Sequence, residues 1–325
     1  MAFRLRLVPE KTNIDFFRWA PVTFGGSVAL VVAAIVLTFF MGLNFGIDFR
    51  GGTTIRTDST QAVDVGAYRQ ALSPLNLGDV TITEVFDPTF RDDQHVAQIR
   101  IQAQEGDEAI TPDTIAAVEA ALQTIDPAIT FPSVESVGPK VSGELIKTAI
   151  YSVLTATVAI CAYIWLRFEW QFSVGAVVAL VHDIALTVGI FSLFQLKFDL
   201  TIIAALLTIL GYSINDTVVV FDRLRENLIK FKSMPLRDVC NLSVNETLSR
   251  TVLTSGTTLI ALIALLVFGG DVIRGFVFAM TWGVIVGTYS SVYVAKNVVL
   301  YLGVKRDWGR KGDTPAGTQF AGDGK

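Results

Sequence analysis

The sequence predicts an α-helical membrane protein with six transmembrane helices and a ferredoxin-like α+β domain inserted after the first of them. Three observations predict this fold class. The chain of 325 residues is 51% hydrophobic and only 17% charged, whereas soluble domains carry about 25% charged residues. Its mean hydropathy is +0.52. Six apolar stretches are long enough to cross a bilayer, and the segment 44–145 between the first two is much more polar.

The composition also excludes several classes of function. A net charge of −4 provides no basic field for nucleic acid, so we expect no nucleic-acid partner. Cys161 and Cys240 are too few for a disulfide framework. The sequence has only two histidines, His95 and His182, and it lacks the motifs GxxxxGK(S/T), HExxH and CxxC. We therefore expect neither an ATPase nor a zinc enzyme, and the sequence predicts no catalytic residue, no metal and no cofactor.

The six predicted spans follow from length and hydropathy, because a helix needs about 20 mostly apolar residues to cross a bilayer. They cover residues 22–43, 146–166, 172–194, 200–220, 251–268 and 273–302. The first span is too long for a cleaved signal peptide, and no small-residue cleavage site follows it. We interpret it as a retained membrane anchor.

The distribution of Lys and Arg predicts the orientation of the chain in the membrane. Placing the N-terminus in the cytoplasm puts 16 basic residues inside, in the tails 1–21 and 303–325, the turn between the second and third spans, and the loop 221–250. The short outer loops then hold two, Lys197 and Arg274. Both termini are therefore expected in the cytoplasm, and the segment 44–145 is expected on the opposite side of the membrane.

The inserted segment alternates short strands and helices. Strands are predicted at 53–57, 80–86, 95–102 and 130–137, from β-rich composition or period-two alternation. Helices are predicted at 62–75 and from Thr111 to Ile125, the second of which has a proline in its first turn. The order βαββαβ is that of a ferredoxin-like domain.

Two acidic residues at membrane depth are candidate functional groups, because ionisable side chains are costly there. Asp183 lies about halfway through the third span and shares an i+4 face with Gly175, Ala179 and Thr187. That pattern leaves a packing role and a functional role equally open. His182 precedes it, and adjacent helical residues are expected to point about 100° apart.

Asp216 lies near the inner end of the fourth span, on a polar stripe with Tyr212. Arg250 begins the fifth span at a depth expected to match that of Asp216 within about a turn and a half of helix. A carboxylate in low dielectric is kept ionised by a nearby guanidinium and is neutralised when that partner leaves. The pattern therefore predicts a proton-titrating pair, with a static ion pair or an arginine that extends to lipid headgroups as the alternatives.

The sixth span carries a seam of small residues at i+4 spacing. Its members are Ala279, Gly283, Gly287, Ser291 and Ala295. Small residues let two helices approach closely in a membrane. We expect this seam to pack against another helix, in this chain or in another subunit.

Several segments resemble the motifs of the SecD/SecF family, which belongs to the resistance-nodulation-division superfamily. Residues 44–52 read NFGIDFRGG and are similar to the family signature GIDFxGG. Residues 137–142 resemble its VGP segment, and residues 182–183 resemble the HD of its third span. Residues 211–227 and 248–255 are similar to the SecF branch of the family, in which the acidic residue of the fourth span stands at the position of Asp216.

The resemblance implies a function. It implies an accessory subunit of the Sec protein-export machinery in the bacterial inner membrane, paired with SecD beside the SecYEG channel and acting on translocating preproteins. It also implies coupling of the proton-motive force to late, ATP-independent translocation. Asp216 is then the titrating carboxylate, Arg250 its basic partner and Asp183 a further member of the proton pathway. The motif residues expected at the joints of the external domain are Asp48, Arg50, Gly51, Gly52, Gly138 and Pro139.

Two other functions compete with this one. A passive scaffold would hold SecD against the channel, using the seam at Gly283, Gly287 and Ser291 as its binding surface. A small-molecule exporter is the other, although such pumps usually have twelve spans and this chain has half that number. Whether the coupling ion is a proton or sodium stays open.

Overall fold

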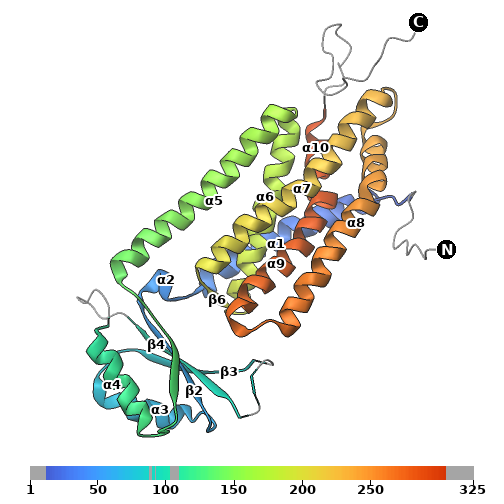
Figure 1. Ribbon diagram of the computed structural model, residues 1–325. Helices are drawn as coiled ribbons and strands as arrows, with labels where there is room; N and C mark the ends of the chain where they lie inside the picture. The colour runs from blue at the N-terminus through green and yellow to red at the C-terminus, as the bar shows by residue number, and fades with distance from the viewer. Residues whose placement is uncertain (1–11, 88–89, 92, 103–109, 305–325) are drawn as a thin grey trace, which may run out of the picture.

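The computed structural model describes residues 12–87, 90–91, 93–102 and 110–304. It consists of a helical bundle with a small α+β domain at one end (Figure 1). The long helices are α1 (Ala20–Met41), α5 (Pro139–Arg167), α6 (Trp170–Leu193), α7 (Leu200–Lys230), α8 (Leu236–Phe268) and α9 (Asp271–Ser290). In the part of the chain that is described, six helical segments are long and apolar enough to cross a membrane. The predicted membrane fold class is confirmed.

The last span is not a single regular α-helix. After α9, a π-helical segment, η2 (Ser291–Ala295), leads into α10 (Lys296–Leu302). Short π-helical segments of this kind are uncommon and often occur at functional sites. The sequence analysis predicted one continuous span at 273–302 and missed this interruption.

Two helices extend beyond the predicted membrane spans. The second long helix begins at Pro139 instead of 146, because proline is well tolerated in the first turn of a helix, where its missing N–H has no partner to lose. The segment 221–250, expected to be a loop, is helical except at 231–235. Hydropathy missed these helical turns because they are amphipathic: Phe221 and Val239 are buried among charged neighbours.

The α+β domain has the predicted ferredoxin-like order. Its elements are β2 (Gly52–Ser59), α3 (Val65–Leu72), η1 (Ser73–Leu75), β3 (Val80–Val85), β4 (His95–Gln102), α4 (Pro112–Gln123) and β5 (Thr130–Val137). The sheet order is β3-β4-β2-β5, and each neighbouring pair is antiparallel. Ile55 and Ile99 on the sheet pack with Leu72 of α3 and Leu122 of α4. The domain therefore has its own hydrophobic core.

A buried carboxylate anchors the end of β2 and makes the stability of this domain dependent on pH. The Ser59 hydroxyl donates to Asp126 Oδ2 at 2.5 Å, and the Ala128 N–H donates to Oδ1 at 2.9 Å. These hydrogen bonds favour the ionised form and hold the pKa of Asp126 below its ordinary value. The stabilisation of the domain is therefore complete above the pKa that Asp126 has in the unfolded chain. It is lost as the pH falls through the lower pKa that Asp126 has in the folded domain, below about pH 4.

We expect the Ser59→Ala variant to destabilise this domain at pH 7 and to reduce the loss of stability on acidification. Hydrogen exchange of the β2 amides in the full-length protein, compared at neutral pH and below about pH 4, measures both effects. Ser136→Ala is the matched control, because the Ser136 hydroxyl bonds to Thr53 Oγ1 at 2.7 Å and not to a carboxylate. Equal pH dependence in wild type and Ser59→Ala would contradict the assignment.

Candidate functional site in the helical bundle

Asp183 is the centre of a polar cluster that joins three helices. It lies on α6 and its side chain is 0% exposed. Its Oδ2 accepts hydrogen bonds from Ser213 of α7 at 2.6 Å and from Ser290 of α9 at 2.8 Å. Its Oδ1 lies 2.9 Å from His182 Nδ1. The Asp183 carboxylate thus connects α6, on which it lies, to α7 and α9.

The side chains of His182 and Asp183 were expected to point about 100° apart, but in the structure they point toward each other. Their Cβ atoms leave the helix in different directions, but both side chains are long enough to bend toward each other. The His182 ring also stacks on Tyr289 of α9, with 6.1 Å between ring centroids and 24° between ring planes. Tyr289 Oη donates to Thr23 O of α1 at 3.0 Å and lies 3.0 Å from Ser27 Oγ. The polar cluster therefore extends from α7 through α6 and α9 to α1.

Asp216 lies on α7, three residues beyond Ser213, and is 4% exposed. Ser255 of α8 donates to Asp216 Oδ2 in a long hydrogen bond of 3.4 Å. The Ser255 hydroxyl also lies 2.7 Å from Thr288 Oγ1 on α9. The Ser255 hydroxyl thus connects Asp216 of α7 to α8, and through Thr288 to α9.

The expected ion pair between Asp216 and Arg250 is not formed in this structure. Both residues are described, and no nitrogen of Arg250 lies within 4.0 Å of the carboxylate; the guanidinium is exposed but still acts on Asp216 electrostatically. The reason is geometric. Ser255, which is level with Asp216, follows Arg250 by five residues, or about 7.5 Å along the helix axis. Pairing requires the arginine side chain or α8 itself to move toward Asp216.

The small-residue seam of the last span lets α9 pack closely against α7. A Cβ added at Gly283 would lie 2.4 Å from Ile209 of α7, and one added at Gly287 would lie 3.1 Å from Ser213 Cβ. Ser291 follows on the buried side and donates to Thr288 O at 3.0 Å. The seam therefore packs against α7 of the same chain. This close approach lets Ser290 of α9 and Ser213 of α7 reach the same oxygen of Asp183.

Lys296 is a buried cation that the sequence analysis missed. It begins α10, its side chain is 0% exposed, and its Nζ makes no hydrogen bond to any described residue. The Nζ lies 4.2 Å from the ring centroid of Phe17, 4.8 Å from that of Phe16 and 5.5 Å from that of Tyr293. An ammonium group over aromatic rings is attracted by their electron-rich faces. Nothing in the local pattern around residue 296 could predict this, because two of the rings come from the other end of the chain.

The first joint between the bundle and the α+β domain is a hydrogen-bonded structure at the GIDFRGG segment. Here β1 (Asn44–Phe45) pairs in parallel with β6 (Lys197–Phe198), and α2 (Ile47–Arg50) follows. Asp48 Oδ2 accepts from the backbone N–H of Leu200 at 3.0 Å, at the N-terminus of α7. Negative charge is favourable at a helix N-terminus. The joint thus connects directly to the helix that carries Asp216.

The glycines of the joint have a defined conformational role. Gly51 has φ 73° and Gly52 has φ 122°, in the region that residues with a Cβ rarely adopt. They turn the chain from α2 into β2. Arg50, just before them, is exposed. On the second connection, Gly138 precedes α5 and Pro139 begins it, so this side of the joint is a helix start and not a loop.

A second contact joins the domain to the N-terminus of α9. Asp87, which follows β3, accepts a short hydrogen bond from the Asp271 N–H. Arg274 donates from Nη1 to Phe86 O at 3.1 Å. The α+β domain therefore touches the first turns of both α7 and α9. No pattern in the sequence pointed to this contact.

The fold and the site define the class of this protein: a polytopic membrane protein that holds ionisable groups inside its helical bundle. Among the described residues, no group of three or more His, Cys, Asp or Glu side chains is arranged to hold a metal ion.

Two family models match the chain. Residues 117–305 match "Protein export membrane protein SecD/SecF, C-terminal", and residues 36–63 match the "SecD/SecF GG Motif". The chain is 72% identical over 321 residues to the protein translocase subunit SecF of Cereibacter sphaeroides, covering 99% of both chains. It is 67% identical to that of Rhodobacter capsulatus, covering 96% of this chain and 95% of the relative. The chain therefore belongs to the SecD/SecF family of protein-export membrane proteins.

Two solved structures are similar in fold. SecDF from a Thermus species, described as a translocon-associated membrane protein, is 34% identical with a TM-score of 0.80. SecDF in a super-membrane-facing form is 36% identical with a TM-score of 0.66. Each match covers 91% of this chain but 39% of the SecDF chain. The present chain thus spans about two fifths of the length of these SecDF chains.

Proposed function

We propose that this chain works with SecD to couple the proton-motive force to the late, ATP-independent stage of preprotein translocation. The complex acts beside the SecYEG channel in the bacterial inner membrane. Both termini lie in the cytoplasm, and the α+β domain lies in the periplasm. The chain is a transport subunit, not an enzyme, and we assign it no catalytic residue, metal or cofactor.

The observation that carries this proposal is the environment of Asp216. Its carboxylate is buried at the contact of three membrane-spanning helices, with a long hydrogen bond from Ser255, while Arg250 lies exposed on α8, five residues before Ser255. When ionised, Asp216 attracts the guanidinium; when protonated, it loses that attraction. Proton binding therefore changes the force between α7 and α8.

Asp183 is the second group of the proposed pathway. Ser213 of α7 connects the two carboxylates, because it donates to Asp183 of α6 and precedes Asp216 on α7 by three residues. The hydroxyls of Ser290 and Thr288 line the facing side of α9. A change in the charge of either carboxylate is therefore felt at the same α7–α9 contact.

The contacts at the two helix N-termini provide a route from the carboxylates to the α+β domain. A shift of α7 moves the Leu200 N–H, which donates a hydrogen bond to Asp48. A shift of α9 moves the Asp271 N–H, which donates a hydrogen bond to Asp87. One charge that crosses 100 mV releases about 2.3 kcal/mol, enough to break contacts of this size. In this proposal the domain moves as the two helices move.

We expect Asp216→Asn to abolish the stimulation of export by a proton gradient while the protein still folds and assembles. Asparagine keeps a hydrogen-bond acceptor for Ser255 but cannot be protonated. The measurement is completion of preprotein export in inverted membrane vesicles containing SecD and the channel, with and without a proton gradient. Asp222→Asn is the matched control, because Asp222 lies on the same helix but is 48% exposed and pairs with Arg167 at 3.5 Å.

Wild-type stimulation in Asp216→Asn would refute the proposal. Replacing the proton gradient by a sodium gradient in the same vesicles identifies the coupling ion. The passive scaffold is less well supported, because the seam at Gly283 and Gly287 packs against Ile209 and Ser213 inside this chain and offers no free surface to a partner.

A further inference from the structure

The segment 12–19, here called the N-terminal strap, packs against the part of the bundle toward which α7 continues beyond Asp216. The Phe16 side chain of the strap is buried in an apolar cluster to which α7, α8 and η2 each contribute one buried residue. These residues are Val220, Val244 and Val292. Val220 follows Asp216 by four residues, or about 6 Å along α7. The Phe16 ring therefore lies in the seam between the three segments, about one helical turn beyond the carboxylate.

Two asparagines of α8 hold the strap by its backbone. Asn245 accepts from the Ile14 N–H through Oδ1 at 2.8 Å and donates from Nδ2 to Ile14 O at 2.9 Å. Asn241, one helical turn earlier, accepts from the Phe16 N–H at 2.9 Å. Each asparagine thus binds a backbone group, independently of the side chains that the strap carries. Because both lie on α8, the strap is attached to the helix that also carries Arg250.

A buried ammonium group lies against the strap and opposes its closed position. The Nζ of Lys296 faces the rings of Phe16 and Phe17 from the strap and the ring of Tyr293. It makes no hydrogen bond to any described residue. Attraction to aromatic rings offsets only part of the cost of removing an ammonium group from water. Departure of the strap would let water reach this group, so the closed position is less stable than its apolar contacts alone would make it.

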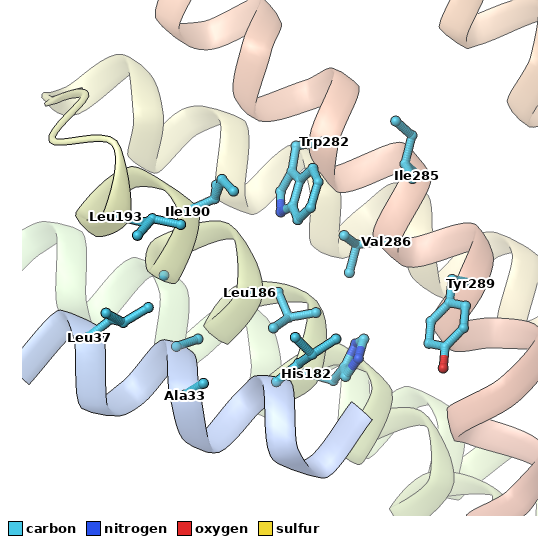
Figure 2. Close-up of a pocket in the computed structure, with 13 residues that line it drawn as sticks. Ala33, Leu37, His182, Leu186, Ile190, Leu193, Trp282, Ile285, Val286 and Tyr289 are labelled. Carbon is cyan, nitrogen blue, oxygen red and sulfur yellow. The ribbon is translucent and has the colours of Figure 1, made fainter. Parts of the chain in front are cut away.

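The cavity between α1, α6 and α9 does not give Asp216 another route to water. It has a volume of about 380 Å³, and side chains such as Leu37, Leu186 and Ile190 make its walls apolar (Figure 2). Asp216 is not among the residues that line it. Apolar cavities stay dry, so this one supplies no chain of water molecules along which a proton could move. The seam that Phe16 fills is the more direct path.

We propose that the N-terminal strap is a gate that separates Asp216 from the cytoplasm. Phe16 closes the seam between α7, α8 and η2, the two asparagines of α8 hold the strap in place, and Lys296 favours its opening. The inference rests on the orientation and on the role of Asp216 given under the proposed function. It adds the element that controls access to this carboxylate from the cytoplasmic side.

Labelling of a cysteine behind the strap by a membrane-impermeant maleimide tests the proposal. The full-length chain carries Val220→Cys, with Cys161→Ala and Cys240→Ala to remove the natural thiols, in inverted membrane vesicles without a proton gradient. We expect slow labelling while the strap is intact. Phe16→Ala is expected to raise the rate at least about tenfold, because loss of a buried aromatic side chain weakens closure by more than the roughly 1.4 kcal/mol that a tenfold change requires.

Lys296→Met gives a result that a general loss of stability does not. Methionine fills a similar volume without a charge, and replacing buried charged groups by apolar ones often stabilises a protein. We therefore expect this variant to hold the strap closed more firmly and to label at Val220→Cys more slowly than the wild-type strap. Trp19→Ala is the matched control for Phe16→Ala, because Trp19 is an aromatic residue of the strap but is 60% exposed. It is expected to leave the rate unchanged.

A second labelling position reports how well the reagent reaches the vesicle surface. Ser233→Cys lies exposed in the turn between α7 and α8 and is expected to label rapidly in every variant. Three results would overturn the gate: rapid labelling of Val220→Cys with the strap intact, equal rates for Phe16→Ala and Trp19→Ala, or faster labelling in Lys296→Met than with the wild-type strap. The labelling needs neither a gradient nor export. Wild-type stimulation in Asp216→Asn would therefore refute the proposed function while the labelling still showed whether the strap closes the seam.

Discussion

Asp183→Leu is expected to destabilise the helical bundle strongly, whereas Asp183→Asn is expected to leave it folded. Leucine removes the acceptor shared by Ser213, Ser290 and His182. Ser213 and His182 Nδ1 then lose their partner, Ser290 keeps only its hydrogen bond to Gly287 O, and each buried polar group without a partner costs about 1–3 kcal/mol. Asparagine retains an oxygen for the two hydroxyls, and the His182 ring can present its other tautomer to the amide N–H. Thermal unfolding of the purified protein in detergent measures the difference.

The same pair of variants separates the two roles left open for Asp183. Because asparagine cannot ionise, a proton-pathway role predicts that Asp183→Asn folds but loses stimulation of export by the gradient. If Asp183→Asn retains full stimulation, Asp183 only joins the helices. If Asp183→Leu is as stable as the wild type, the hydrogen bonds described for this cluster do not stabilise the bundle.

Gly283→Ala is expected to force α9 away from α7. The added methyl group would lie 2.4 Å from Ile209 Cδ1, closer than any relaxed contact between carbon atoms. Overpacking of this kind costs about 1–3 kcal/mol. The displacement also separates Ser290 from Ser213, so we expect both the thermal stability and the gradient response to fall.

Gly256→Ala is the matched control for this prediction. Gly256 lies in the interior of α8, and a Cβ added there meets no atom within 4 Å. Alanine at such a helical position is expected to be neutral or to stabilise by up to about 1 kcal/mol. Combining Gly283→Ala with Ile209→Val should recover part of the loss. Equal unfolding temperatures for Gly283→Ala and Gly256→Ala would contradict the proposed packing.

The architecture could be predicted from the sequence because it depends on local patterns. Membrane-spanning helices need long apolar runs, and the α+β domain alternates short strands with amphipathic helices; both signals are visible in short windows. The prediction was less accurate where helices are amphipathic, as at 221–230 and 236–250. There the buried residues alternate with charged ones, and hydropathy alone indicates a loop.

The site was only partly predictable because its contacts join distant segments. Asp183 and Asp216 were identified by their depth, which is a local property. Their partners Ser213, Ser255 and Ser290 lie on other helices or turns, and a serine in an apolar run does not reveal which carboxylate it faces. The contacts of Lys296 with aromatic rings were the hardest to predict. Two of those rings, Phe16 and Phe17, lie about 280 residues away in the sequence.

The central claim is that Asp216 changes its protonation state during the transport cycle. Infrared difference spectroscopy of the reconstituted complex, with the Asp216→Asn variant subtracted, measures this most directly. We expect a protonated-carboxyl band that grows as a proton gradient is imposed and is absent from the variant. A carboxylate that stays ionised at every pH and membrane potential would contradict it.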